Sequence, residues 1–79
     1  MNPVKQDESA MHQITLQLNG EPCSIDADAS ISDLLRANGL EHKPVAVEVN
    51  HDIVPRSEHP THQLQAGDKV EIVHAIGGG

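Results

Sequence analysis

The sequence predicts an α+β domain in which one helix packs on one face of a small mixed sheet. Two observations indicate this class. Several stretches alternate between apolar and polar residues with a period of two, and one stretch among them has the spacing of an amphipathic helix. The chain has 79 residues, which allows a single small domain with a thin hydrophobic core.

A β-hairpin begins the periodic part of the chain. Every second residue of 14–18 is apolar, which predicts a half-buried strand. Asn19 and Gly20 follow at once, and this pair favours a type I′ turn because both central residues of that turn need a positive φ. The return strand at 22–26 places Cys23 on the inner face, where a free cysteine usually packs as a small hydrophobe.

A short helix is predicted to begin after Ser30 and to end before Gly39. Ser30 is a favoured N-cap, and Asp33 stands at the position of the acid in a capping box. Gly39 suits the left-handed position after the helix, and Leu40 is the apolar residue that usually follows it. One apolar stripe faces the sheet and consists of Ile31, Leu34 and Leu35. A helix this short depends on the sheet for its stability.

Alternating valines predict a third strand at 45–49. Residues 50–52 are expected to form a turn. A short strand at 53–54 follows, and Pro55 confines it to an edge of the sheet because proline cannot donate a ladder hydrogen bond.

The final strand is predicted to lie beside the first strand, between the first and the third. It follows a polar, irregular segment at 56–66, with Pro60 and Leu64 as inward anchors, and a turn at 66–68. Its apolar residues lie on both faces, as is typical of a central strand. We expect Val70 and Ile72 to serve ordinary sheet packing.

Three segments are expected along the chain. Residues 1–11 are polar and aperiodic, which predicts a disordered leader without the apolar core of a signal peptide. Residues 12–75 form the β-sheet domain, and residues 76–79 form a flexible, glycine-rich tail. No apolar run is long enough to span a membrane, and a single cysteine cannot form an internal disulfide. We therefore expect a cytoplasmic protein.

The composition excludes several classes of function. Aspartate and glutamate number 12 against 5 lysines and arginines, which gives a formal charge of −7, and aromatic residues are absent. Nucleic-acid binding needs a basic surface, and an anionic membrane would repel this chain. The expected partners are proteins with basic or apolar docking surfaces.

Neither autonomous catalysis nor a metal site is predicted. Cys23 could act as a nucleophile with a histidine as its base, but it is predicted to face the core, and so small a chain rarely holds a ligand cleft. Only His59 and His62 are close in sequence, whereas a zinc site needs four ligands. We expect all six histidines to be solvated surface residues: His12, His42, His51, His59, His62 and His74.

The tail is the most informative feature of the sequence. Gly77, Gly78 and Gly79 come shortly after the last predicted strand. Because glycine has no Cβ, such a backbone can pass through a narrow channel without steric clashes. A carboxylate that must reach a buried active site in another protein would be built this way, and the alternative for such a tail taken alone is a plain flexible terminus.

Together these features resemble the ThiS family, the sulfur carrier proteins of thiamine biosynthesis, which have the ubiquitin-like β-grasp fold. The resemblance covers about residues 12–79. It rests on the stretches 14–21, 32–35, 45–50, 53–56 and 67–79. The most specific motifs are Val-Pro-Arg at 54–56 and the ending from Gly67 to Gly79.

The resemblance implies a reaction sequence and the residues that take part in it. An E1-like adenylating enzyme of the ThiF type would use ATP and magnesium to adenylate Gly79, and a persulfide donor would convert it to a thiocarboxylate. A thiazole synthase of the ThiG type would receive the sulfur. Gly77 and Gly78 would thread the partner's channel, with Gly78 next to the reactive carboxyl. Ile76 and the outer apolar side chains of the sheet would dock the partner. The chain would bind no cofactor and act as a protein co-substrate, not as an enzyme.

Other interpretations stay open. The small sulfur-carrier subunit of molybdopterin synthase shares the fold, the tail and the chemistry, but its family tends to use aromatic residues at the interface, and this chain has none. A ubiquitin-like modifier would join its tail to a target lysine. A plain β-grasp interaction module would not need its tail at all.

Overall fold

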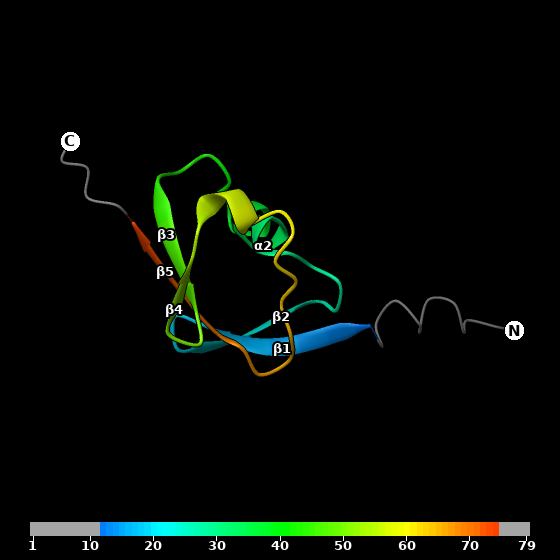
Figure 1. Ribbon diagram of the computed structural model, residues 1–79. Coiled ribbons are helices and arrows are strands. Elements are labelled where there is room, and N and C mark those ends of the chain that lie inside the picture. Colours follow the sequence, from blue (N-terminus) through cyan, green and yellow to red (C-terminus); the bar gives the residue numbers. More distant parts are fainter. Residues whose placement is uncertain (1–11, 75–79) are drawn as a thin grey trace, which may run out of the picture.

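The computed structural model describes residues 12–74 (Figure 1). The leader predicted at 1–11 and the tail predicted at 76–79, together with Ala75, lie outside the described residues. Within the described part, no helix is long and apolar enough to cross a membrane.

The elements of residues 12–74 follow the predicted order. They are β1 (Gln13–Leu18), β2 (Glu21–Asp26), α2 (Ile31–Ala37), β3 (Val45–Val49), β4 (Asp52–Val54), η1 (Arg56–Glu58) and β5 (Lys69–His74). The strands form one mixed sheet in the order β2-β1-β5-β3-β4, and α2 covers one face of it (Figure 1). The predicted α+β arrangement is confirmed. The segment at 56–58, expected to be irregular, forms the short 3₁₀ helix η1.

The core lies between α2 and the inner face of the sheet. Its fully buried members come from the helix, from three strands and from the segment before β5: Leu16, Ile31, Leu34, Val47, Leu64 and Val70. The predicted inward anchor Leu64 is therefore confirmed. Cys23 on β2 is half-buried and packs against this core, on the inner face as predicted.

β5 comes last in the chain and lies at the centre of the sheet. It runs antiparallel to β3, with register pairs from Val45–His74 to Val49–Val70, and parallel to β1. Val70 and Ile72 point into the core, with 1% and 9% of their surface exposed. The predicted central position and the predicted packing role of these two residues are confirmed.

Both hairpin turns place asparagine in the left-handed region. Asn19 and Gly20 have φ values of 52° and 87°, as the predicted type I′ turn requires. Asn50 and His51 have φ values of 54° and 75°. This second turn has only two residues, and Asp52 belongs to β4, which is an edge strand as predicted.

Asn19 also extends the pairing between β1 and β5. Its N–H donates to the Val70 carbonyl at 2.8 Å, and its side-chain Oδ1 accepts the N–H of Ile72 at 2.8 Å. β1 ends at Leu18, so the amide of Asn19 takes the place of the next backbone carbonyl along that strand. A partly buried backbone donor of β5 is thereby satisfied.

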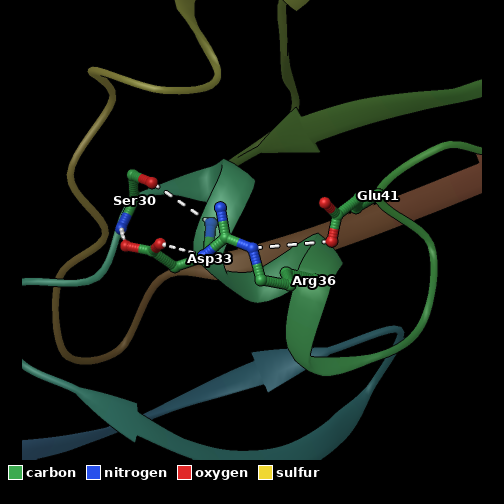
Figure 2. A network of polar contacts seen from close by, with 4 residues as sticks. All are labelled: Ser30, Asp33, Arg36 and Glu41. Carbon is green, nitrogen blue, oxygen red and sulfur yellow. Dashed lines mark hydrogen bonds and ion pairs between the residues drawn. The ribbon is translucent and has the colours of Figure 1, made fainter.

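α2 begins with the predicted capping box (Figure 2). The Asp33 N–H donates to the Ser30 hydroxyl at 3.2 Å, and the Ser30 N–H donates to the Asp33 carboxylate at 2.9 Å. The helix ends as predicted. Gly39 has a φ of 72° and donates to the Arg36 carbonyl, and the next residue, Leu40, donates to a carbonyl one turn earlier.

The segment after η1 completes the start of α2. The N–H groups of Ile31 and Ser32 donate to the carbonyls of His62 and His59, at 3.1 Å each. These are two of the donors that have no partner within a helix. The segment before β5 is therefore fixed to the helix by backbone hydrogen bonds as well as by Leu64.

The second inward anchor of this segment is His59, and the prediction of Pro60 in that role is wrong. Pro60 is exposed, whereas His59 is 5% exposed, and its Nε2 lies 3.1 Å from the Val54 carbonyl oxygen. This hydrogen bond satisfies the polar edge of the ring and allows its carbon atoms to be buried. The prediction of a solvated histidine is therefore wrong for His59. His62 is half-buried, and the others are exposed: His12, His42, His51 and His74.

Removal of the Asn19 side chain should destabilise the fold. Asn19→Gly keeps a residue suited to positive φ but leaves the Ile72 N–H without its acceptor, which should cost about 1–2 kcal/mol of unfolding free energy. For a domain of this size, each kcal/mol lowers the melting temperature by about 4–8 °C. Circular dichroism on heating measures the melting temperature of each variant. Asn50→Gly is the control, because the Oδ1 of Asn50 accepts the Lys69 N–H at an exposed site and should matter less. Equal losses in the two variants would contradict this role of Asn19.

The capping box should make stability depend on pH on the acid side. The Ser30 N–H holds the pKa of Asp33 below its ordinary value of 3.8, and the Ser30 hydroxyl and the Arg36 guanidinium act in the same direction, while desolvation opposes them. Because the folded-state pKa is the lower one, this stabilisation is complete above the unfolded-state pKa and is lost as pH falls through the folded-state pKa.

Asp33→Asn should remove this pH dependence. The difference in melting temperature between wild type and the variant should shrink as pH falls from about 6 to about 3. Thermal melts across this range measure it. A difference that stays constant over the whole range would contradict the assignment.

Candidate functional site

The structure describes the strand from which the predicted functional tail leaves. Ile76, Gly77, Gly78 and Gly79 themselves lie outside the described residues. β5 ends at His74, which pairs with the first residue of β3. The chain therefore leaves the described part beside the start of β3.

Both turn asparagines hold β5 in its register. In the middle of β5, the Ile72 N–H donates to Asn19 Oδ1. At its start, the Lys69 N–H donates to Asn50 Oδ1 at 3.0 Å, and Asn50 Nδ2 donates to Asp68 Oδ1 at 3.0 Å. β3 pairs with β5 from Val70 to His74, and β1 pairs with it at Lys69 and Val70. A rigid central strand thus precedes the tail.

The outer face of the sheet, opposite α2, carries exposed apolar side chains near the end of β5. Val73 is 54% exposed and pairs with Ala46 on β3, and Ile53 on β4 is 69% exposed. We call Ala46, Ile53 and Val73 the outer patch. Glu48 lies between its members, paired with both Ile53 and Glu71. Such a surface suits a partner with an apolar centre and basic groups around it.

The other chemistry-bearing candidates do not form a site. Within residues 12–74, no group of three or more histidine, cysteine or acidic side chains is placed to hold a metal ion. His59 is occupied by its hydrogen bond to Val54, and His62 supplies a backbone carbonyl to α2. Half-buried Cys23 pairs across the hairpin with buried Leu16, as a packing residue would.

The motif at 53–56 is recognisable in the sequence, but the sequence predicts no roles for its individual residues. The structure separates those roles. Ile53 points outward into the outer patch, Val54 is buried, and Arg56 begins η1 on the helix side of the sheet. Side chains alternate between the two faces of the short edge strand β4, and this alternation indicates that Ile53 points outward. No local pattern in the sequence indicates which residues surround the Arg56 side chain.

Comparison with known proteins places this chain in a family. The ThiS family model matches residues 16–79, which include most of the described domain and the three glycines of the tail. The chain belongs to the ThiS family. Its tail therefore lies within the matched region, although the structure does not describe it.

Individual relatives agree with this assignment. The sulfur carrier protein ThiS of Bacillus subtilis strain 168 is 42% identical over 65 residues, which cover 81% of this chain and 98% of that protein. The thiazole synthase of Magnetococcus marinus is 41% identical over 64 residues, which cover 81% of this chain and 20% of the synthase. The chain thus spans about a fifth of the length of this synthase.

A solved structure confirms the fold. The crystal structure of the thiamine biosynthesis protein ThiS from Geobacter metallireducens matches with a TM-score of 0.73 and 29% sequence identity. The match covers 84% of this chain and all of the other. The ubiquitin-like β-grasp fold implied by the sequence resemblance is therefore correct.

Proposed function

We propose that this ThiS-family chain is a sulfur carrier of thiamine biosynthesis and that the Gly79 carboxyl group carries the sulfur as a thiocarboxylate. The main support is the 42% identity to the sulfur carrier protein ThiS of Bacillus subtilis over 98% of that protein's length. The family match, which extends to Gly79, adds to it. In this role the chain is a protein co-substrate that is consumed and regenerated, and it is not an enzyme.

Activation of the carboxylate is the first chemical step. A carboxylate is a poor electrophile because its negative charge is delocalised over two oxygens. In the proposed reaction, a carboxylate oxygen of Gly79 attacks the α-phosphorus of ATP, and pyrophosphate leaves. The product is an acyl-adenylate with AMP as a good leaving group. ATP and magnesium belong to a ThiF-type adenylating enzyme, and this chain supplies only the nucleophilic carboxylate.

Sulfur transfer follows. The terminal sulfur of a persulfide donor attacks the acyl carbon, and AMP leaves with the electron pair of the broken carbon–oxygen bond. A thiol then reduces the sulfur–sulfur bond and releases the thiocarboxylate. A ThiG-type thiazole synthase takes the sulfur for the thiazole ring. A cytoplasmic location, with ATP and thiols at hand, fits this chemistry and stays a prediction.

The described domain supports this role through presentation and docking. β5 pairs with β3 as far as His74 and with β1 at its start, so it would offer an ordered base for the tail. Gly77 and Gly78 would pass through a narrow channel of the partner. The outer patch would dock the partner enzymes together with Ile76. The net charge of −7 would speed association with basic surfaces.

The tail should be essential for the reaction and dispensable for the fold. Incubation with ATP, magnesium, a ThiF-type enzyme and a persulfide source should shift the intact mass by the replacement of one oxygen with sulfur. Deletion of Gly79 should abolish this shift and change the unfolding free energy by less than about 0.5 kcal/mol. No shift with an adenylating enzyme proven active on its own carrier would contradict the thiamine assignment. The molybdopterin-type enzyme would then be tested.

The outer patch should matter for recognition. Val73→Asp places a charge at the centre of the proposed contact and should raise the KM of the adenylating enzyme for the carrier about tenfold, the effect of losing roughly 1.4 kcal/mol of binding. Thr15→Asp is the matched control, because it makes a similar change at an exposed position of β1, outside the patch. Thermal melts check that both variants fold. Equal KM values for the two variants would contradict a docking role for the patch.

A further inference from the structure

A hollow on the helix side of the sheet opens at the end of the molecule where β5 stops. It has a volume of about 450 Å³ and lies between the end of α2, the loop before β3, and η1. Leu35 and Val45 supply apolar wall. Val45 is also the residue that pairs with His74 at the end of β5. The hollow therefore borders the point from which the chain continues toward Gly79.

Most of the described cationic side chains gather in this hollow. Residues 12–74 include four lysines and arginines, and three of them line it: Arg36, Lys43 and Arg56. The fourth, Lys69, lies at the opposite end of β5. We call the hollow, with these three cations and the apolar walls, the cationic pocket. Its positive charge contrasts with the net charge of −7 on the chain.

Two of these cations are open to a ligand. Arg36 already pairs with Asp33 at 3.0 Å and with Glu41, which also lines the pocket, at 3.5 Å (Figure 2). Lys43 and Arg56 form no ion pair within residues 12–74. The Arg56 Nη2 donates to the Lys43 carbonyl at 3.2 Å. This bond holds the guanidinium at the pocket wall and leaves its other N–H groups for an anion.

We infer that the cationic pocket receives an aspartate or glutamate side chain of the thiazole synthase. The inference rests on the proposed function. Arg56 and Lys43 both match a carboxylate in charge, the planar fork of Arg56 also suits its two oxygens, and Leu35 and Val45 suit the methylene groups.

The tail is short, so a synthase that binds Gly79 must lie close to the end of β5. Five residues follow His74, and fully extended they reach roughly 17 Å. A protein that takes Gly79 into its active site must therefore approach the end of β5 and the pocket beside it. The thiazole synthases of Magnetococcus marinus and Paramagnetospirillum magneticum each contain a region similar to this chain, which favours the synthase as the partner.

Calorimetric titration of the full-length carrier with the thiazole synthase tests the inference. Arg56→Gln and Lys43→Gln should each raise the dissociation constant about tenfold. Lys69→Gln removes the same charge outside the pocket and should change it by less than about twofold. Arg56→Lys should recover only part of the loss, because lysine lacks the planar fork. Both pocket residues are exposed, and thermal melts verify that their variants fold.

A charge exchange identifies the partner group. Arg56→Glu should weaken binding further than Arg56→Gln. Replacement of one acidic residue with lysine, in a series of synthase variants around the entrance of its tail channel, should restore most of the affinity for Arg56→Glu and weaken that for wild type. Restoration by a single position supports a direct pair. Restoration by every added lysine indicates general electrostatics and overturns the inference.

Three further results would overturn it. The first is an equal loss of affinity from Arg56→Gln and Lys69→Gln, and the second is no loss from either pocket variant. The third is saturable binding of inorganic phosphate to the free carrier, seen as amide chemical-shift changes around the pocket, which would assign the pocket to a small anion.

The mass assay distinguishes a failure of the pocket assignment from a failure of the proposed function. If wild type forms the thiocarboxylate while the pocket variants bind the synthase normally, only the pocket assignment fails.

Discussion

The insertion of the last strand between β1 and β3 is the constraint on which the rest of this structure depends. Val70 and Ile72 bring the central strand into contact with the core beneath α2, and the strand needs hydrogen-bond partners on both edges. β3 supplies one edge over its whole length. β1 is parallel to β5 and pairs with only its first residues, so the amide of Asn19 continues the ladder. Backbone pairing and the Asn19 amide thus hold the strand that precedes the tail in its register.

The segment between β4 and β5 connects the helix to this arrangement. The carbonyls of His59 and His62 accept the first two N–H groups of α2, and the capping box satisfies the N–H groups of Asp33 and Ser30. Burial of the His59 ring against the Val54 carbonyl fixes the same segment to β4. Arg56 begins η1 three residues before His59, so these bonds fix the backbone from which its side chain extends. The Arg56 guanidinium itself donates to the Lys43 carbonyl at the wall of the cationic pocket.

Local patterns in the sequence predicted much of this fold, because local physics determines those features. Asn19 and Gly20 favour one turn type wherever they occur, and Ser30 with Asp33 forms a capping box within a single helical turn. The central position of β5 followed from its apolar residues on both faces. The burial of His59 could not be predicted this way, because its partner is a backbone carbonyl that the β4 edge happens to present.

The candidate site also has parts that local sequence predicts and parts that only the tertiary fold creates. The glycines of the tail were evident from the sequence, as was the family motif at 53–56. The cationic pocket was not, because Arg36, Lys43 and Arg56 come from a helix, a loop and a 3₁₀ turn, and only the tertiary fold brings them together. Side chains that are separate in sequence and polar in character give no periodic signal.

The distribution of charge bears on how a partner could be oriented at the end of β5. A net charge of −7 attracts basic partners, but at physiological ionic strength this attraction is screened beyond about 8 Å and carries little directional information. The three glycines at 77–79 have no side chains with which to discriminate between partners, which leaves Ile76 as the one larger side chain of the tail. Orientation must therefore come from short-range contacts that flank the tail. The outer patch and the cationic pocket lie on opposite faces of the sheet, and Val73 of the patch and Val45 of the pocket both lie near the end of β5, so a partner that contacted both surfaces would be restricted in its orientation relative to that end.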